Sequence, residues 1–483
     1  MAHEYEIIMW LETHVRVKSN TKMFCSCANA IELASEPNMN VCPLCMGFPG
    51  MLPTLSEGVV DLAVRASHAM RCEVMQESIF DRKSYFYPDL PMGYQITQLY
   101  HPIAMGGEVQ AFVGDEVKTF RIHHMHIEND AWKLVHAGGK TLCDYNRAGS
   151  PLMEIVTEPD FRSKSEVIAY LEELQKLMRW CGASDADMEK WQLRCDVNIS
   201  IRKIGETTLR NRVELKNINS FSSIGRAIDV EYARQIEIYE SGTTLDQETR
   251  GWNDEKWYST SLRSKEDAMD YRYFPDPDLP PLHLTKQYIE ERNIGELPID
   301  RRLKYVSEYH LSSDDARILS SDRLTSDFFE ELVEVSGDPR KSCSYITTIL
   351  FAIFEWHHEK IDLSCMKWGA EEVGKVIQMV NSDELSSTNS KIVIEKLVFE
   401  WWSTSEWIEK LELRQSNDTS ALEAIVDHVI VENTSQIAEY KAGKETLFGF
   451  FVGQCMKASK GQGNPKIFTE ILKKKLSLRT ENF

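Results

Sequence analysis

The feature that most constrains the fold of this sequence is a change of character near residue 290. Before that point, short β-rich runs such as VQAFVG, CDVNISIR and VELKN alternate with Gly- and Pro-containing segments such as PDLPMGY and AGSPL. After the proline-rich segment at 275–282, the chain becomes acidic, poor in β-rich runs and helical in pattern, as in DFFEELVEV. Strands with inserted helices, but no regular strand–helix alternation, predict an α+β fold with a largely antiparallel sheet.

The length of 483 residues is enough for two or three domains. We expect a β-rich domain at residues 1–292, a helical domain at 293–407 and a helical C-terminal tail domain at 408–483.

Two helices are predicted within the β-rich region. The first begins at a Ser-x-x-Glu capping box formed by Ser163 and Glu166, and Gly182 can end it. Its apolar residues recur on one face, and they are Val167, Leu171, Leu174, Met178 and Cys181. The second helix is expected at residues 225–240.

The net charge of −20 argues against a protein coated in nucleic acid, because neutralising phosphates requires Lys and Arg. The sign reverses locally at residues 451–483, where seven basic residues stand against two acidic ones. We expect a polyanion to bind this C-terminal segment.

Three observations bear on the compartment. No stretch approaches the roughly 18 uncharged apolar residues that a membrane span needs. The N-terminus has no basic segment leading into an apolar run. Eleven cysteines without regular pairing spacings suit a reducing environment. We therefore expect a cytoplasmic protein without a membrane partner.

Four cysteines form the strongest metal-binding pattern. Cys25-Ser-Cys27 is followed, after fourteen residues, by Cys42-Pro-Leu-Cys45. Two close pairs can present four thiolates to one tetrahedral Zn²⁺, and because protein would fill every position we predict a structural zinc site. The alternatives are four unrelated thiols, or a site that no longer holds its metal.

Acidic residues at strand spacing give a candidate catalytic site. Glu12 and His14 are two residues apart, so a strand would point both side chains to one face. Glu128 lies in MHIEND, Glu154 in LMEIVTEPD and Asp196 in RCDVN. Such carboxylates with a few imidazoles can hold Mg²⁺ against nucleotide phosphates and would suit phosphoryl transfer. Alternatively, each is an ordinary solvated strand residue.

Two further segments invite a nucleotide or nucleic-acid interpretation. Gly138-Gly139-Lys140-Thr141 resembles the end of a P-loop, but Leu134 stands where the first glycine belongs, so we predict a turn. The block at residues 81–98 interleaves bases with aromatic residues, which could stack on nucleic acid. It could equally be a rigid loop packed on the core.

Several long runs resemble the B subunit of tRNA-dependent amidotransferases. In order, they are CPLCMGFPGMLP, DRKSYFYPDLPMGYQITQ, DYNRAGSPLMEIVTEPD, LRCDVNISIR, VELKNINSF, RSKEDAMDYRYFPDPDLPPL and GQCMKASKGQGNPK. They span residues 42–466, nearly the whole chain. The resemblance implies a cradle domain, a helical domain and a tail domain that grips the tRNA.

The resemblance also implies an activity. ATP would phosphorylate the side-chain carboxylate of a misacylated amino acid on Glu-tRNA(Gln), Asp-tRNA(Asn) or both. Ammonia, released from glutamine by a glutaminase A subunit, would then displace the phosphate, and a small C subunit would stabilise the pair. The enzyme would be a carbon–nitrogen ligase with glutamine as the amido donor.

Roles for individual residues follow from the same resemblance. Glu128, Glu12 and His14 are the expected catalytic and magnesium-binding residues, and Glu154, Asp196 and Lys83 are expected at the ATP or substrate site. The four cysteines match the zinc ligands of the family. The expected tRNA-binding residues of the tail are Lys457, Lys460, Lys473, Lys474 and Lys475.

The chain departs from the family pattern at a few positions. Trp10 stands where the family usually has Gly, Asn129 replaces an acid, and Trp132 replaces a small residue. Bulk at positions 10 and 132 is expected to narrow the pocket. Two rival functions remain open: a non-catalytic, zinc-containing tRNA-binding scaffold, and a ligase that acts on a small acid without tRNA.

Overall fold

The computed structural model describes residues 4–29, 36–88, 90–131, 133–264, 271–357, 362–416, 418–459 and 462–478. The chain divides into two compact units, Met1–Ile299 and Asp300–Phe483. The first is rich in strands and the second is helical, which confirms the predicted α+β class.

The first unit is built on one ten-stranded sheet. All of its strand pairs are antiparallel except β13–β14, and β7 pairs with β8 beside the main path. In spatial order the sheet contains β15 (Tyr258–Ser264), β14 (Glu248–Asn253), β13 (Val213–Lys216), β12 (Leu193–Lys203), β1 (Tyr5–Arg16), β11 (Pro151–Thr157), β8 (Glu116–Asn129), β6 (Ala104–Met105) and β2 (Glu73–Val74), with β7 at Glu108–Val113.

Smaller strand pairings complete this unit. A three-stranded sheet joins β16 (Phe274–Pro275), β4 (Asp81–Ser84) and β5 (Tyr94–Thr97), and β17 (Leu282–His283) pairs with β3 (Glu77–Ser78). The hairpin of β9 (Lys133–Ala137) and β10 (Lys140–Asp144) turns at Gly138 and Gly139, whose φ angles are +57° and +74°. Two positive φ values suit a tight two-residue hairpin turn, so the segment that resembled a P-loop is the predicted turn.

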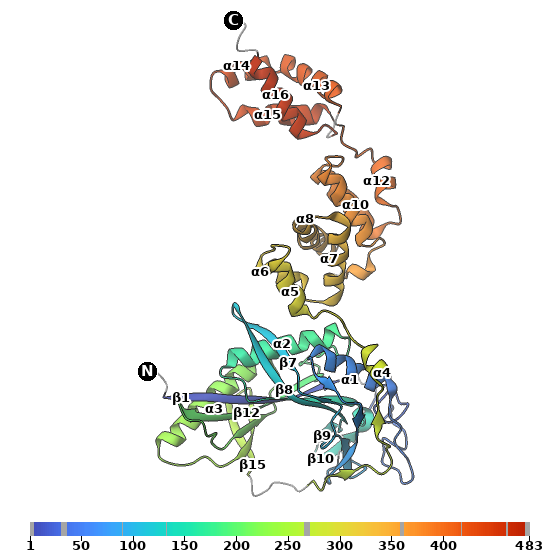
Figure 1. The fold of residues 1–483 in the computed structure, drawn as a ribbon, viewed down its shortest axis with the longest axis vertical. Helices are drawn as coiled ribbons and strands as arrows, with labels where there is room; N and C mark the ends of the chain where they lie inside the picture. The colour runs from blue at the N-terminus through green and yellow to red at the C-terminus, as the bar shows by residue number, and fades with distance from the viewer. Residues whose placement is uncertain are drawn as a thin grey trace. The chain divides into compact units, whose positions relative to one another are not determined.

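The two faces of the sheet differ in character because the central strand β1 alternates. Met9, Leu11 and Val15 are fully buried, whereas Glu12 and His14, on the other face, are half-buried. Helices α1 (Glu57–Ala69), α2 (Lys164–Trp180) and α3 (Phe221–Glu240) contribute to the same core as the buried β1 residues. Figure 1 shows α2 lying along one side of the sheet, with β9 and β10 on the other. The opposite face is thereby left for polar chemistry.

Helix α2 confirms its sequence prediction, since Ser163 and Glu166 form the capping box and the predicted apolar stripe is fully buried. Helix α3 begins four residues earlier than predicted. Ser220 is its N-cap and accepts a hydrogen bond from the Ser223 amide, and this cap precedes the apolar repeat that marked the helix in the sequence.

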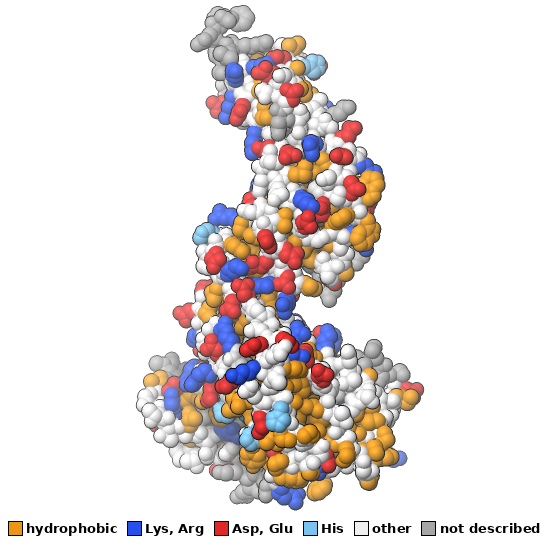
Figure 2. Space-filling model, turned by 45° about the vertical axis from the view of Figure 1, so that its right-hand side comes forward, with side chains coloured by type: hydrophobic (Ala, Val, Ile, Leu, Met, Phe, Trp, Pro, Cys, Tyr) orange, Lys and Arg blue, Asp and Glu red, His pale blue; other side chains and the backbone are white. Residues whose placement is uncertain are grey.

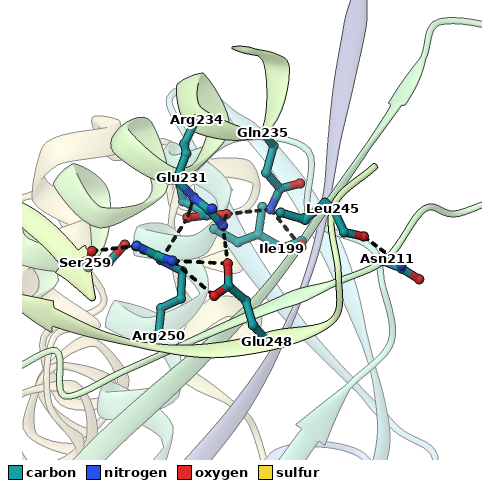
Figure 3. Close-up of polar contacts among 9 residues, drawn as sticks. All are labelled: Ile199, Asn211, Glu231, Arg234, Gln235, Leu245, Glu248, Arg250 and Ser259. Carbon is teal, nitrogen blue, oxygen red and sulfur yellow. Dashed lines mark hydrogen bonds and ion pairs between the residues drawn. The ribbon is translucent and has the colours of Figure 1, made fainter. Parts of the chain in front are cut away.

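A charged network attaches α3 to the sheet (Figure 3). The Glu231 carboxylate, only 1% exposed, accepts hydrogen bonds from Arg234 at 2.9 Å and Gln235 at 2.9 Å. Arg234 also donates to Glu248 at 2.9 Å, and Arg250 donates to Glu248 at 3.1 Å. Two carboxylates and two guanidinium groups therefore neutralise one another between helix and sheet.

The second unit is helical throughout its described length. Its elements are α5 (Pro298–Ser307), α6 (Ser313–Leu319), α7 (Arg323–Ser336), α8 (Pro339–Ser344), a π-helical turn (Tyr345–Leu350), α9 (Phe351–Trp356), a 3-10 turn (Leu363–Cys365), α10 (Ala370–Asn381), α11 (Ser387–Phe399), α12 (Thr404–Lys410), α13 (Thr419–Glu432), α14 (Thr434–Lys441), α15 (Leu447–Ala458) and α16 (Pro465–Leu478). The short helix α4 (Lys286–Glu290) and a 3-10 turn at Tyr145–Arg147 belong to the first unit.

This unit contains two separate hydrophobic cores, one drawn from residues 305–408 and one from residues 422–476. On the face that Figure 2 shows, acidic and basic side chains are interspersed along the helical part of the chain. In the part of the chain that the structure describes, no helix has both the length and the apolar character needed to cross a membrane.

Candidate active site

The polar face of the sheet gathers carboxylates from five neighbouring strands, and β1 lies in the middle. On one side Glu12 is paired with Asp196 of β12, and on the other side His14 is paired with Glu154 of β11. The strand spacing predicted that Glu12 and His14 share a face, and the register brings partners from distant parts of the chain to both.

The first cluster contains His14, Glu128 and Glu154, whose ligand atoms all lie within 4.8 Å of one another. His14 Nε2 is 3.1 Å from Glu154 Oε2 and 3.8 Å from Glu128 Oε1. His126, beside Glu128 on β8, places Nε2 3.5 Å from Glu154 and 3.7 Å from Glu128. Two carboxylates and two imidazoles therefore converge on one point.

The second cluster contains Glu12, Asp196 and Glu214, again within 4.8 Å of one another. Lys216 Nζ contacts Glu214 Oε1 at 2.8 Å and forms a short hydrogen bond to Asp196 Oδ2. Asn198 donates to Glu12 at 3.0 Å. The structure thus places Glu12 with Asp196, while His14 and Glu128 belong to the neighbouring cluster.

The ionisation of both clusters reflects burial and mutual charge. Burial alone would lower the pKa of His126, but Glu154 and Glu128 raise it to about 10. Burial, followed by the charges of Glu154 and Glu214, raises the pKa of Glu12 above its usual value. Burial and neighbouring carboxylates both disfavour the ionised form of Glu12, and a cation bound beside it would favour that form.

An open cavity of about 300 Å³ adjoins the two clusters. It is lined by His14, Trp191, Arg194, Cys195, Asp196, Lys216, Asn217, Ile218 and Asn219. Arg194 is anchored through Asp130, at 3.2 Å. Burial lowers the pKa of Lys216, but Asp196 and Glu214 outweigh it and the net change is upward. Two cations and the carboxylate of Asp196 thus line one cavity beside the two clusters, an arrangement suited to phosphates and divalent metal ions.

Lys83, predicted at the ATP or substrate site, extends from β4 with Nζ 4.9 Å from the centre of the Tyr271 ring. Burial would lower its pKa, but Glu128 leads a group of neighbours that raise it. Lys83 therefore belongs to the electrostatic environment of the first cluster.

Four site residues were not singled out from the sequence: His126, Arg194, Glu214 and Lys216. The sequence could have indicated each of them, because each lies two residues from another charged or titratable site residue in a predicted strand, so both side chains point to the same face. Glu214 and Lys216 alternate in VELK, and His126 and Glu128 alternate in MHIEND. Residue spacing identifies side chains that share a face of one strand, but it does not reveal which strands are neighbours in the sheet.

The four cysteines lie together, as their spacing predicts. Cys45 Sγ is 3.7 Å from Cys25 Sγ, 3.7 Å from Cys42 Sγ and 3.9 Å from Cys27 Sγ. Zn–S bonds of about 2.3 Å in a tetrahedron place sulfurs about 3.8 Å apart, so the residues fit a zinc ion. The Cys25 thiol, and to a smaller extent the Lys22 ammonium at 3.6 Å, lower the pKa of Cys45 to about 4. A thiolate is therefore already favoured at one ligand position.

The positions that depart from the family pattern have identifiable surroundings. Asn129 accepts a hydrogen bond from the Ile96 amide at 2.7 Å and so ties β5 to β8. Trp10 is half-buried beneath the guanidinium of Arg212, 5.4 Å from the ring centre, and it does not line the cavity. Trp132 lies outside the described residues.

The residues of the block at 81–98 differ in their exposure to solvent. Arg82 is held by Asp276 at 2.8 Å and lies 4.0 Å from the centre of the Tyr94 ring. Phe86 and Tyr87 are 79% and 60% exposed. The basic part is thus packed into the fold, and these two aromatic side chains are at the surface.

The predicted tRNA-binding lysines lie on the last two helices. Lys457 is exposed near the end of α15, and Lys473 and Lys474 are exposed on α16. Lys475 is half-buried and contacts Asp427 of α13 at 2.6 Å. Lys460 lies outside the described residues.

Comparison with known proteins extends over the whole chain. The GatB/GatE catalytic domain matches residues 7–290, and the GatB domain matches residues 327–476. A protein of Persephonella marina is 44% identical over 98% of this chain and 100% of its own length, and one of Lachnospira eligens is 41% identical over 98% and 99%. One of Picosynechococcus is 40% identical over 98% of both chains. All three are aspartyl/glutamyl-tRNA(Asn/Gln) amidotransferase subunits B, and this confirms the resemblance seen in the sequence runs. The chain therefore belongs to the GatB family, that of the B subunits of tRNA-dependent amidotransferases.

Proposed function

We propose that this chain uses ATP to phosphorylate the side-chain carboxylate of Glu-tRNA(Gln), Asp-tRNA(Asn) or both, and then amidates it with ammonia supplied by a glutaminase partner. The observation that carries the proposal is the pair of adjacent carboxylate clusters beside a cavity with two permanent cations. The names of the relatives support the same substrates.

The proposed reaction has two steps. A carboxylate oxygen of the aminoacyl group attacks the γ-phosphorus of ATP, which yields an acyl phosphate and ADP. The nitrogen of ammonia then attacks the acyl carbon, phosphate leaves, and the nitrogen loses a proton. The first step is needed because a carboxylate is a poor acyl donor, whereas phosphate is a good leaving group.

The residues of the chain would position and neutralise the reacting groups, which is most of what phosphoryl transfer requires. Arg194 and Lys216 would hold phosphate oxygens in the cavity. Lys83, within the field of Glu128, would face the substrate carboxylate or the incoming ammonia. The site would demand little covalent chemistry from the protein.

The carboxylate clusters fit magnesium, since each offers closely spaced carboxylate oxygens as ligands. Glu128, Glu154 and His14 would hold one ion, and Glu12, Asp196 and Glu214 a second. Bound Mg²⁺ would neutralise negative charge on the phosphates of ATP. The four cysteines would hold a structural zinc ion, because they leave no ligand position for a substrate.

We further propose that the chain works with a glutaminase A subunit and a small C subunit in the cytoplasm. The exposed lysines at 457, 473 and 474 would contact tRNA in a tail domain of residues 408–483, and the same role is proposed for Lys475 and Lys460. The three-domain division at 292 and 407 belongs to the same proposal.

The test is ATP hydrolysis by the chain assembled with its partners, with and without misacylated tRNA. We expect turnover only when Glu-tRNA(Gln) or Asp-tRNA(Asn) is added, and the tRNA that supports it identifies the substrate. Turnover without tRNA would indicate a small-acid ligase. Measurable tRNA binding with no turnover would indicate a non-catalytic scaffold.

A further inference from the structure

Trp191 is an unusual residue at the wall of the cavity. Its side chain lines the cavity together with Arg194 and Lys216, yet the residue is 54% exposed. Its backbone has a φ of +58°, in the left-handed region that bulky residues rarely adopt. Other residues of the described chain, Trp257 among them, share a positive φ, so the position of Trp191 on the cavity wall is what points to a function.

The loop that carries Trp191 is held in place by its own hydrogen bonds. The Trp191 amide donates to Met188 O at 3.1 Å, and the Gln192 amide donates to Asp187 O at 2.9 Å. The Gln192 side chain accepts from the Asp187 amide at 3.1 Å, and Arg16 of β1 donates its amide to Gln192 O at 2.9 Å. The indole is therefore presented on a fixed loop, so a ligand that stacks on it has little loop motion to arrest.

The chemistry around the indole matches one class of ligand. An aromatic face stacks on a nucleobase, and the amide groups of Asn217 and Asn219, on the same cavity, can donate to and accept from a base edge. Arg194 and Lys216 supply positive charge for phosphates. Base-binding and phosphate-binding groups thus line a single cavity of about 300 Å³.

We propose that Trp191 is the stacking platform for the adenine base of a substrate in this cavity, an inference that rests on the proposed use of ATP and tRNA. Adenine reaches such a site from two sources, namely ATP and the 3′-terminal adenosine of the tRNA. Both present the same purine face, and the experiment below separates them.

The first arm measures binding of Mg·ATP and of inorganic tripolyphosphate to the full-length chain by equilibrium dialysis. If the base of ATP stacks on Trp191, W191G weakens Mg·ATP binding about tenfold or more, the size of one base–aromatic stack. Tripolyphosphate, which has no base, binds W191G and the wild type equally. W191F keeps an aromatic ring and stays within about threefold of the wild type for Mg·ATP.

The second arm compares intact tRNA with tRNA lacking its 3′-terminal adenosine. If that adenosine is the stacking base, W191G reduces the affinity for intact tRNA about tenfold, to that of the shortened tRNA. The affinity of W191G for the shortened tRNA is then unchanged from the wild type. Glycine adopts a φ of +58° without strain, so W191G keeps the loop conformation, and its melting temperature verifies this.

The matched control is W257G. Trp257 is also exposed, at 62%, and also has a positive φ of +55°, but it lies in the turn between β14 and β15. Wild-type binding of both Mg·ATP and intact tRNA by W191G would overturn the proposal, as would equal losses in W257G or a wild type that binds neither ligand. If W191G loses affinity selectively but the assembled wild type shows no tRNA-dependent ATP turnover, the stacking role stands and the proposed function fails.

Discussion

Two charged regions on opposite faces of the same sheet differ in how their charge is compensated. Strand β14 contributes to both: Glu248 and Arg250 join the network beneath α3, whereas Thr249 donates to Glu214 of the site at 2.8 Å. In the network each carboxylate has guanidinium partners (Figure 3). In the two site clusters five carboxylates share Lys216 and two imidazoles among the described contacts, and the charges of Lys83 and Arg194 act on Glu128 from further away.

The difference teaches what each region is for. A charge set that is balanced within the protein stabilises the fold and requires nothing from outside. In the clusters burial, followed by the charges of Glu154 and Glu214, raises the pKa of Glu12, and a bound external cation would stabilise its carboxylate. Variants should therefore separate the two regions: changes in the network should alter stability, and changes in the clusters should alter activity and metal response.

The largest expected effect is on activity. E128Q removes a charge from the first cluster, so we expect tRNA-dependent ATP turnover in the assembled complex to fall by about 10²–10³-fold. Binding of tRNA should be unchanged. E116Q, at the exposed start of the same strand β8, is the matched control and should keep full turnover. Normal turnover in E128Q would remove Glu128 from the reaction centre.

The sequence predicts the features of the fold and the site that depend on residues close together in the chain. The capping box at Ser163, the alternation of Glu12 with His14 and the paired cysteines all lie within short segments. The register of β1 with β11 and β12 joins residues about 140 to 200 positions apart, and it depends on the packing of the whole sheet. Spacing therefore named Glu12 and Glu128 but did not reveal that Glu12 lies with Glu214.

The four cysteines are a third cluster of titratable side chains, and a bound zinc ion would contribute to stability there. We expect metal analysis to find one zinc ion per chain in the wild type and none in C42S. The substitution should also lower the free energy of unfolding by about 2–4 kcal/mol, or about 5–10 °C in Tm, because a structural ion couples its binding to folding. C365S, at an exposed cysteine of the helical unit, should change neither quantity. A zinc-free wild type with the same Tm would contradict a structural zinc site.

The charged network beneath α3 should reveal itself through stability and pH. Burial opposes ionisation of Glu248, but the Ser261 hydroxyl, Arg250 and Arg234 lower its pKa. Its stabilisation is therefore complete above the unfolded pKa of about 4.3 and is lost as pH falls through the lower folded value. E248Q should be less stable at pH 7 by about 1–2 kcal/mol, because Arg234 and Arg250 lose a charged partner and, among the described carboxylates, share only Glu231. In chemical denaturation the gap to the wild type should close below about pH 4, while ATP turnover at pH 7 stays normal.

The smallest expected effect is the rise in melting temperature that magnesium should cause when it binds the two carboxylate clusters. Magnesium that binds the folded clusters with a Kd of about 1 mM should, at about 10 mM, stabilise the protein by about 1.4 kcal/mol. For a unit of this size that is about 2–4 °C in Tm. E214Q removes a ligand of the second cluster and should reduce the shift, whereas E248Q should melt at a lower temperature yet keep the full shift. The two glutamates belong to adjacent strands of one sheet, so differential scanning calorimetry with and without magnesium distinguishes them by charge compensation alone. Equal responses in E214Q and wild type would mean that the second cluster is compensated from within the protein, like the network beneath α3.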